Sequence, residues 1–485
     1  MKLKISSNSI NSIFLIIIKI FTIMSGILCT AILSKSLTLE LYGTYSQLNL
    51  IVAIGTSITA IGLMDATNYY YNKTDDENIQ KENIDTVMSL QVLIGFVVGI
   101  CILAFNKVIS GYFGNKVLSS MIIFIAFRPM FTNFILDLQI LQIAIGKTKA
   151  IIVKNIFFSL LRLIAIIISV YITHNIKTIL VAFITFDIIT TFYFKKNFEK
   201  EKFKISLFKI NLRKSKEIMM YSIPMGIYIM TNSLSRDIDK LIIGKFCGTE
   251  KLAIYSNCAT LLPFDIVSSS FLTIIIPIMT KYINTKELKK GRNLFSNYIK
   301  IGYITTISFT IVSVVLSKEI VLLLYGEKYL LGQNIFILYA IVDMLKFANL
   351  SLILSANGET KTLMKYSIIS LCVNFILNIL FYKIFGFIGP AISTILITGI
   401  LSTFLMKRSA VILGTTLRKI IDWKSFIDYI VKALCLGVFT YLVKDRLINN
   451  SIHYISLIFI IGIFYVGVIF FINRRDLISS MQKIE

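Results

Sequence analysis

The chain has 485 residues, of which 56% are apolar and 16% are charged, and its mean hydropathy is +0.79. Soluble domains contain about 25% charged residues, whereas here long apolar runs recur from one end of the chain to the other. This composition excludes a soluble enzyme, a secreted disulfide scaffold and a disordered chain. It predicts an all-α, polytopic membrane protein, because only helices satisfy the backbone of such segments within hydrocarbon.

Apolar windows of about 20 residues recur along the chain in two groups of six and a final pair. The first six lie near residues 10–33, 45–64, 86–105, 117–145, 151–172 and 179–194. The second six lie near residues 218–243, 252–278, 296–316, 332–355, 362–381 and 387–406, and the pair lies near 427–443 and 452–472. The sequence therefore predicts about 14 transmembrane helices.

The distribution of basic residues predicts the orientation of these spans. The net charge of +24 comes from 50 Lys and Arg residues against 26 Asp and Glu residues. Alternate connections carry 31 basic residues on the side that includes both termini and 11 on the other side. Because basic loops stay on the cytoplasmic side, both termini are predicted to be cytoplasmic. The excess charge then indicates contact with anionic membrane lipid rather than with nucleic acid.

An internal repeat divides the predicted spans. At a shift of 212 residues, GKTKAIIVKNI at 146–156 aligns with GETKTLMKYSI at 358–368. The predicted divisions are an N-terminal bundle at 1–200, a basic cytoplasmic linker at 201–217, a C-terminal bundle at 218–410, and two further spans with a tail at 411–485. Six spans per repeat give the bundles the same orientation. They are expected to be parallel and pseudosymmetric around a central cavity that supports alternating access.

Metal and nucleophile chemistry have little support in the sequence. The six cysteines are scattered without a CxxC pair, and His174 and His453 are the only histidines. The sequence also lacks the GxxxxGK[ST] phosphate loop. We therefore expect no disulfide framework, no metal site and no catalytic residues, and we predict that the protein is not an enzyme.

Charged residues inside the predicted spans are the candidate functional residues. The basic ones are Lys19, Arg128, Arg162, Arg236, Lys240, Lys300, Lys346 and Lys432. Lys19, Arg128 and Arg236 lie deepest, where a charge is costly unless it faces protein or water. Asp137, Asp187, Asp265 and Asp343 add intramembrane carboxylates, each of which could be functional or could simply pair with a nearby cation.

The segment SLSRDIDKLIIGKF at 233–246 holds the densest cluster of charges in any predicted span. Arg236 and Asp239 are three residues apart, as are Asp237 and Lys240, so each pair can be neighbours on a helix. One interpretation is a self-neutralised strip that packs two helices together. The other is a polar stripe that lines a cavity, with Arg236 available to an anionic group.

Three segments carry a resemblance to a known family. They are ILSKSLTLELYGTYSQLNLIVAIGTSITAIGL at 32–63, RDIDKLIIGKFCGTEKLAIYSNCATLLPFDI at 236–266 and LSANGETKTLMKYSIISLCVNFILNILFYKIFGFIGPAIST at 354–394. With these segments the chain resembles the polysaccharide-transport branch of the multidrug/oligosaccharidyl-lipid/polysaccharide (MOP) exporter superfamily, and especially its Wzx-type O-antigen flippases. The resemblance covers nearly the whole chain but does not identify the transported glycan.

The resemblance implies 12 to 14 helices in two bundles around a V-shaped cavity. It implies a flippase that moves undecaprenyl-pyrophosphate-linked oligosaccharide across the bacterial cytoplasmic (inner) membrane for surface polysaccharide biosynthesis. Cations of the first, fourth and seventh spans, Lys19, Arg128 and Arg236, are then the expected ligands of the pyrophosphate and glycan. Asp137, Asp237 and Asp239 are candidates for ion coupling and Lys240 for the polar cavity wall, while H⁺, Na⁺ and no coupling ion all stay open. Polysaccharide polymerase and chain-length proteins are further expected partners.

Two alternatives stay open at this point. Within the same superfamily, the chain could be a multidrug or lipid-II exporter. From a different class, it could be a membrane-embedded repeat-unit polymerase or glycosyltransferase. A polymerase is expected to carry a long outward loop with polar catalytic residues, whereas the outward connections predicted here are short.

Overall fold

The computed structural model describes residues 7–173, 175–208, 211–260, 262, 264, 266–449 and 453–484. Within these ranges it describes side chains from Phe21 onward, apart from those of residues 148, 266, 267, 273 and 449. Every regular element within these ranges is helical. Ten helical segments within these ranges are long and apolar enough to cross a membrane, and one of them, 360–412, joins two helices of 26 and 24 residues. The all-α membrane fold is therefore confirmed, and the predicted number of 14 spans is compatible with this set.

The chain forms two compact units, Met1–Ala253 and Ile254–Glu485. The helices of unit 1 are α1 (Ser7–Ser36), α2 (Leu39–Ala60), α3 (Leu63–Asn72), α4 (Glu77–Ala104), α5 (Asn106–Phe113), α6 (Lys116–Met121), η1 (Ile122–Phe124), α7 (Arg128–Ala144), α8 (Thr148–Ile168), η2 (Ser169–Thr173), α9 (Ile176–Glu201) and α10 (Leu212–Phe246). The division between the units falls inside α11 (Gly248–Cys258).

Unit 2 contains the remaining helices of the chain. They are α12 (Ile266–Ser270), α13 (Leu272–Asn284), α14 (Leu288–Val315), α15 (Ser317–Leu324), η3 (Glu327–Gly332), α16 (Gln333–Leu345), α17 (Leu352–Ala356), α18 (Thr360–Phe385), η4 (Gly386–Ile388), α19 (Gly389–Ile412), α20 (Leu417–Ile420), α21 (Trp423–Asn449), α22 (Tyr454–Ile472) and α23 (Arg474–Gln482).

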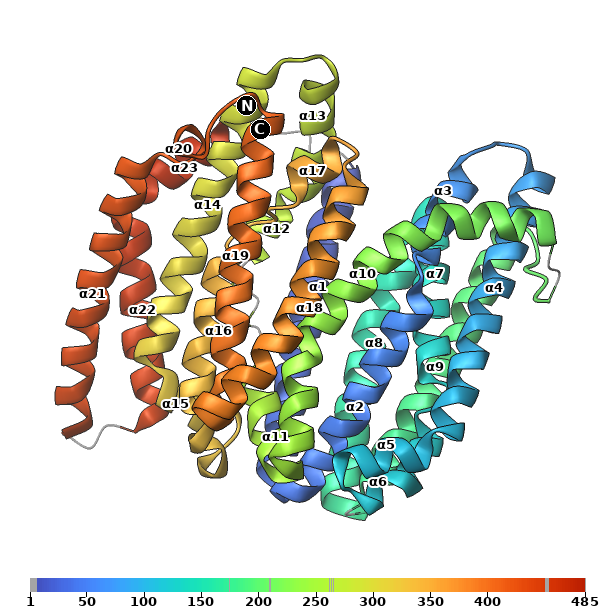
Figure 1. Ribbon diagram of the computed structural model, residues 1–485, viewed down its shortest axis with the longest axis horizontal. Coiled ribbons are helices and arrows are strands. Elements are labelled where there is room, and N and C mark those ends of the chain that lie inside the picture. The colour runs from blue at the N-terminus through green and yellow to red at the C-terminus, as the bar shows by residue number, and fades with distance from the viewer. Residues whose placement is uncertain are drawn as a thin grey trace. The chain divides into compact units, whose positions relative to one another are not determined.

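In unit 1, α7 is the central helix and packs on α2, α3, α4 and α9, while α1 packs on α8 (Figure 1). Buried Phe134, Leu138 and Leu141 of α7 meet Ile84 and Met88 of α4 in one apolar core. α10 also belongs to this unit, because it packs on α2, α3 and α4. The packing units and the repeat are thus different divisions of the chain, and the ranges predicted from the repeat stay a prediction.

A glycine turn between α2 and α3 fits closely against α10. Ile61 and Gly62 have φ values of +32° and +70°, so the helix ends in a left-handed turn. A Cβ atom on Gly62 would lie 2.3 Å from the carbonyl oxygen of Ser222, and one on Gly226 would lie 2.3 Å from the carbonyl carbon of Ile61. Only glycine allows the two backbones to approach this closely.

In unit 2, α14 is the central helix, and it packs on α16, α21 and α22. Its buried aromatic residues include Phe295, Tyr298 and Tyr303. The Tyr429 hydroxyl of α21 donates to the carbonyl oxygen of Ile304 at 2.6 Å. Burial of these large aromatic side chains, together with the satisfied hydroxyl of Tyr429, holds the C-terminal helices on this core.

The order of helices confirms the internal repeat. α8 begins at Thr148 and α18 at Thr360, which is the predicted shift of 212 residues. Each is preceded by a left-handed glycine, Gly146 at φ +72° and Gly358 at φ +75°. In both turns the glycine N–H donates to a carbonyl three residues earlier, and the following N–H to one five residues earlier. This is the geometry that terminates helices at a glycine.

Several predicted spans are interrupted helices. The span at 117–145 consists of α6, η1 and α7, and its last break precedes Pro129, which cannot continue a helix interior. The span at 332–355 is broken between α16 and α17 instead. A hydropathy window cannot detect such breaks, because it averages over about 20 residues and each break is only a few residues long.

Candidate functional site

A polar cavity of about 200 Å³ lies within unit 1, among α1, α7, α8 and α9. Its wall consists of Thr22, Arg128, Ile135, Lys154, Asn155, Phe158, Ser159, Arg162, Phe183, Phe186, Asp187 and Thr190. We call this the cationic cavity, because it holds three cations and one carboxylate. All four helices have candidate spanning length or a long apolar stretch, so the cavity lies among candidate membrane spans.

One face of α8 supplies five of the lining residues. Lys154, Asn155, Phe158, Ser159 and Arg162 follow one another at intervals of one, three, one and three residues. That spacing keeps side chains on one side of a helix. The same helix is otherwise rich in isoleucine and leucine, so the polar residues form a single stripe.

Arg128 and Asp187 form the ion pair of the cavity. Arg128 is the first residue of α7, and its Nε lies 3.0 Å from Oδ2 of Asp187 in α9. Their side chains are 16% and 21% exposed. The positive end of the α7 dipole disfavours a cation, so Asp187 stabilises the arginine in this position.

Arg162 and Lys154 add positive charge around this pair. The guanidinium groups of Arg128 and Arg162 lie 5.2 Å and 4.9 Å from the centre of the Phe183 ring. Lys154 lies 5.9 Å from the centre of the Phe194 ring and is within electrostatic range of Asp187. One carboxylate cannot neutralise three cations, so the cavity attracts an anion.

The chemistry that the wall offers is recognition of phosphate. Guanidinium groups bind phosphate oxygens through two parallel N–H donors, and a lysine adds a mobile charge. Thr22, Asn155, Ser159 and Thr190 supply hydroxyl and amide groups suited to further hydrogen bonds. These groups can hold and release an anion.

The structure places the three predicted ligands in different surroundings. Arg128 lines the cationic cavity. Lys19 lies in α1, one helical turn before Thr22, in the part of that helix whose side chains are outside the described residues. Arg236 is not part of the cavity wall, and its Nη2 donates to Oγ of Ser233 on its own helix at 2.9 Å. Their roles stay a prediction.

The cluster in α10 is partly paired within its helix. Lys240 Nζ lies 2.8 Å from Oδ1 of Asp237, as the three-residue spacing indicates. The backbone N–H of Lys240 donates to Oδ1 of Asp239, a residue that is 1% exposed. This arrangement agrees with the interpretation as a neutralised strip, and Arg236 stays exposed beside it.

Asp137 is a buried carboxylate with incomplete hydrogen bonding. Its side chain is 1% exposed, and Oδ1 accepts a hydrogen bond from the Thr67 hydroxyl at 3.3 Å. Oδ2 of Asp137 and Oδ2 of Asp65 are both buried without a hydrogen-bond partner among the described atoms. A buried carboxylate oxygen without a donor is suited to a proton or a cation.

Sequence reasoning did not select Lys154 and Arg162 as ligands. Lys154 lies near the start of the predicted span at 151–172 and is one of the 31 basic residues assigned to the cytoplasmic side. Arg162 is one of the eight basic residues inside the spans. The signal that could have found them is the polar stripe along α8, because its four polar members share one helix face. Asp187 pairs with a cation, which was one of its two expected roles.

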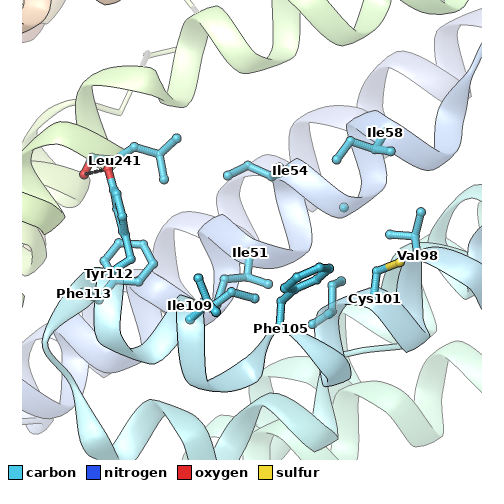
Figure 2. Close-up of a pocket in the computed structure, with 13 residues that line it drawn as sticks. Ile51, Ile54, Ile58, Val98, Cys101, Phe105, Ile109, Tyr112, Phe113 and Leu241 are labelled. Carbon is cyan, nitrogen blue, oxygen red and sulfur yellow. Dashed lines mark hydrogen bonds between the residues drawn. The ribbon is translucent and has the colours of Figure 1, made fainter.

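A second cavity in unit 1 is almost entirely apolar. It has a volume of about 630 Å³ and lies between α2, α4, α5 and α10. Figure 2 shows Ile51, Ile54 and Ile58 of α2 along one wall and Phe105 and Cys101 on another. At one end the Tyr112 hydroxyl donates to the carbonyl oxygen of Leu241 at 3.2 Å. This apolar groove is suited to a hydrocarbon chain.

The fold is that of a multi-pass membrane protein with a cationic cavity, and comparison with known proteins identifies its family; several of the proteins that it resembles are named as flippases or transporters. A family model for polysaccharide biosynthesis proteins matches residues 32–331. This match covers more than half of the chain, so the protein belongs to that family. The predicted relation to polysaccharide-transport proteins is thereby confirmed at the level of this family, and solved structures of the MOP superfamily share its fold.

Two characterised relatives are similar in sequence. The chain is 23% identical over 337 residues to the capsular polysaccharide biosynthesis protein CapF of Staphylococcus aureus, covering 66% of this chain and 80% of that protein. It is 24% identical over 189 residues to the probable lipid II flippase MurJ of Rickettsia prowazekii (strain Madrid E). That second alignment covers 36% of this chain and spans only 35% of the length of the relative.

Solved structures share the fold. A lipid II flippase MurJ in an inward closed conformation has a TM-score of 0.75 and 17% identity, covering 95% of this chain and 99% of that chain. A multidrug resistance MATE family transporter of the MOP superfamily, in an inward-facing conformation, has a TM-score of 0.61 and 13% identity, covering 81% and 96%. Together with the ten membrane-length segments, the relatives indicate a multi-pass bacterial membrane protein.

Proposed function

We propose that the protein is a flippase for undecaprenyl-pyrophosphate-linked oligosaccharide, which it moves from the inner to the outer leaflet for surface polysaccharide biosynthesis. The observation that carries this proposal is the cationic cavity in a chain of the polysaccharide biosynthesis family. A pyrophosphate and a hydrated glycan cannot cross hydrocarbon unaided, because the desolvation of a charged group is prohibitively costly. Three cations at membrane depth reduce that cost.

In this mechanism Arg128 and Arg162 bind the pyrophosphate oxygens, and Lys154 contributes charge. Asp187 pairs with Arg128 while the cavity is empty, which keeps the arginine in place and limits its desolvation cost. An incoming pyrophosphate then competes with Asp187 for the guanidinium. Because the carboxylate remains nearby, it also favours release, so binding stays reversible as transport requires.

The remaining predicted residues have roles outside this cavity. Lys19 and Arg236 are proposed to contact the pyrophosphate or glycan at another stage of the cycle, beside the polar residues Asp237, Asp239 and Lys240. Asp137 is proposed to bind the coupling ion, H⁺ or Na⁺, because one of its buried oxygens has no hydrogen-bond donor among the residues that the structure describes. The apolar groove is proposed to contact the lipid chain of the substrate while its head group crosses.

The proposed location is the bacterial cytoplasmic membrane, with both termini in the cytoplasm. The proposed partners are the undecaprenyl-linked glycan, anionic membrane lipid, and the polymerase and chain-length proteins that would use the exported units. The excess of basic residues on one side of the predicted spans supports this orientation.

The test is an export assay in cells that lack the chromosomal copy and carry a plasmid variant. Arg162→Ala removes a cation of the cavity, and Lys432→Ala removes a cation of α21 that pairs with Asp428. We expect Arg162→Ala to reduce surface polysaccharide and to accumulate lipid-linked units in the inner leaflet. We expect Lys432→Ala to behave as the wild type. Normal export by Arg162→Ala, at equal protein level, would contradict the assigned role.

A second candidate is export of lipid II, because a lipid II flippase shares this fold. Its substrate also carries an undecaprenyl pyrophosphate, so the cationic cavity supports it equally. The sugar is what distinguishes the two functions. Complementation of a strain that lacks its lipid II flippase would favour this candidate, whereas rescue of surface polysaccharide alone would favour the first.

A further inference from the structure

Residues 202–208, between α9 and α10, are hydrogen-bonded to α4. The backbone N–H of Ser206 donates to Oδ1 of Asp85 at 2.8 Å, and that of Phe208 donates to Oγ of Ser89 at 3.0 Å. Figure 1 shows this connection at the edge of unit 1, beside the end of α4. Because both acceptors belong to α4, the segment has a defined position there.

Side chains of this segment alternate between the core and the surface. Phe203 and Ile205 are buried, and the Phe203 ring contacts that of Phe198 at a centroid distance of 5.3 Å. Lys202 and Lys204 are exposed. In an extended chain successive side chains point to opposite sides, so burial of the two apolar residues directs the lysines outward.

Two large apolar side chains nevertheless remain on the surface. Phe208 is 73% exposed and Leu212 is 83% exposed. Phe208 has a φ of +71°, a conformation that residues other than glycine rarely adopt. Hydrogen bonding to Ser89 holds the backbone at that point. The fold thus exposes the Phe208 side chain, although Phe203 and Ile205 of the same segment are buried.

The first turns of α10 continue the same surface. Leu212, Lys216 and Met220 are exposed and spaced by four residues, which places them on one helix face. Ile218 and Ser222 are buried, so the opposite face packs on the protein. Figure 1 shows these turns running across the end of unit 1 before α10 descends beside α2. Pro224, inside α10, permits such a change of direction.

Exposed cations surround the apolar residues. Lys202, Lys204 and Lys216 are exposed. Arg213 is 92% exposed and lies 3.9 Å from Glu217, a distance at which an exposed pair contributes little. A helix that combines basic and large apolar residues on its surface is typical of binding at a membrane interface, and clustered Lys and Arg select anionic lipid.

We propose that residues 202–208 and 211–220 form an interfacial anchor that binds the anionic leaflet on the side of the α9–α10 connection. Phe208, Leu212 and Met220 insert among the acyl chains, and the cations contact lipid phosphates. The inference rests on the proposed function only for the identity of this leaflet, which is then the cytoplasmic one. The anchor holds the edge of unit 1 at a fixed depth.

Tryptophan fluorescence tests the anchor in the full chain. The protein has one tryptophan, so Trp423→Phe gives a silent background into which Phe208→Trp introduces a single reporter. The protein is reconstituted into vesicles of phosphatidylcholine and phosphatidylglycerol, with bromine on the acyl chains of one lipid at a time. We expect stronger quenching when phosphatidylglycerol carries the bromine at equal mole fraction. We also expect bromine near the head group to quench more than bromine near the chain end.

Two variants separate charge from depth. Replacing Lys202, Lys204, Arg213 and Lys216 by Gln is expected to reduce the preference for phosphatidylglycerol, by up to about fivefold for each cation. High salt is expected to have a similar effect. As the matched control, Phe375→Trp reports on an exposed aromatic position of α18. It should be quenched by both lipids without a charge preference.

Two outcomes overturn the proposal. Quenching of the residue 208 reporter by aqueous iodide, with none by brominated lipid, would assign this face to water or to a cytoplasmic protein. Equal quenching by both lipids would remove the anionic selectivity. The measurement does not depend on transport, and an Arg162→Ala variant should retain the lipid contact. Failure of the anchor and failure of the flippase proposal are therefore distinguishable.

Discussion

The two units share a repeat of helices, but only unit 1 carries the cationic cavity. At the shift of 212 residues, the positions of Arg128, Lys154, Arg162 and Asp187 correspond to Ala340, Tyr366, Asn374 and Gly399. Helices α18 and α19 form with these neutral residues just as α8 and α9 form with charged ones. The repeat therefore does not require the charges, and their presence at membrane depth calls for a functional reason.

The units also differ in the position of the helix break in the predicted span that precedes α8 in unit 1 and α18 in unit 2. In unit 1 the break precedes α7, so Arg128 lies at a helix start and Asp137 lies inside a continuous helix. In unit 2 the break falls between α16 and α17, and the residue that corresponds to Asp137 is Asn349, within that break. The same apolar pattern thus supports two local structures. Unit 1 buries Asp137 within a continuous helix, and unit 2 buries Asp343 near the end of α16.

The largest expected effect comes from making unit 1 resemble unit 2 in the cavity. The double variant Arg128→Ala and Asp187→Ala removes both members of the ion pair. Removing both partners avoids an unpaired buried charge, so we expect normal folding. We expect export to be lost, because one buried charged contact to the pyrophosphate contributes about 2 kcal/mol or more, about 30-fold in affinity. Surface polysaccharide and lipid-linked units are measured in cells that carry only the variant.

Protein level in the membrane is the control for this variant, with Lys432→Ala as a cation removed elsewhere. Wild-type amounts of surface polysaccharide from the double variant would mean that the pair has a structural role only. The contrast between the units would then have no bearing on transport.

A second substitution, Asp137→Asn, introduces the residue found at the corresponding position of unit 2. Asn has nearly the same shape, and its carbonyl can still accept the hydrogen bond from Thr67. If Asp137 binds the coupling ion, export becomes insensitive to the ion gradient and its rate falls about tenfold or more, since an amide cannot carry the proton or charge. Transport into vesicles with and without imposed H⁺ and Na⁺ gradients measures this.

Thr67→Val serves as the control for Asp137→Asn, because it removes the hydrogen bond and keeps the carboxyl group. A variant Asp137→Asn that still responds to both gradients would exclude Asp137 as the coupling residue. A loss of folded protein in Asp137→Asn alone would assign the carboxyl group to the core instead.

The glycine turn of unit 1 provides a third test, of stability. At the corresponding position unit 2 has Ile274 inside α13, so the turn is specific to unit 1. Gly62→Ala combines a left-handed φ with a clash against Ser222, and we expect it to lower the free energy of unfolding by about 2–5 kcal/mol. Thermal unfolding in detergent measures the effect.

Gly114→Ala is the matched control for the turn. Gly114 has a similar φ of +63°, but no atom lies within 4 Å of its Cβ position. The expected cost is about 1 kcal/mol, from backbone strain alone. Equal destabilisation by the two substitutions would mean that the close approach to α10 contributes nothing.

The smallest expected effect concerns the glycine turns that the repeats share. In unit 1 Lys147 pairs with Glu201, whereas in unit 2 the charges are reversed and Glu359 accepts two hydrogen bonds from Arg408, at 2.8 and 2.6 Å. These bonds lower the pKa of Glu359. The pair therefore stabilises the fold above the usual glutamate pKa of about 4.3, and this contribution is lost as the pH falls through the lowered pKa.

We expect Glu359→Gln to cost about 0.5–1 kcal/mol at neutral pH, because Arg408 is partly exposed. The difference from the wild type should disappear in acid, where the carboxyl group is protonated in both states. Thermal unfolding at neutral and acid pH tests this. A difference that persists in acid would mean that shape rather than charge stabilises this turn.

The sequence predicted the spans and the repeat because both depend on local pattern. A run of about 20 apolar residues must be helical in hydrocarbon, and the shared glycine turns at 146 and 358 recur in the sequence letters themselves. It could not predict that Lys154 and Arg162 join Arg128 in one cavity. Those residues lie on different helices, and lateral packing of spans leaves no signal in a hydropathy pattern.

By itself, the sequence determined the class of protein, the helical repeat and the presence of charges at membrane depth. The physical reason is that the backbone N–H and C=O groups of a segment in hydrocarbon must be paired within that segment, which makes it helical. Tertiary structure alone decided which charges meet. Arg128 pairs with Asp187, and the guanidinium groups of Arg128 and Arg162 both contact the Phe183 ring. Arg236 instead contacts Ser233 on its own helix. Packing brings together residues from separate helices, and their distances follow from helix contacts rather than from spacing along the chain.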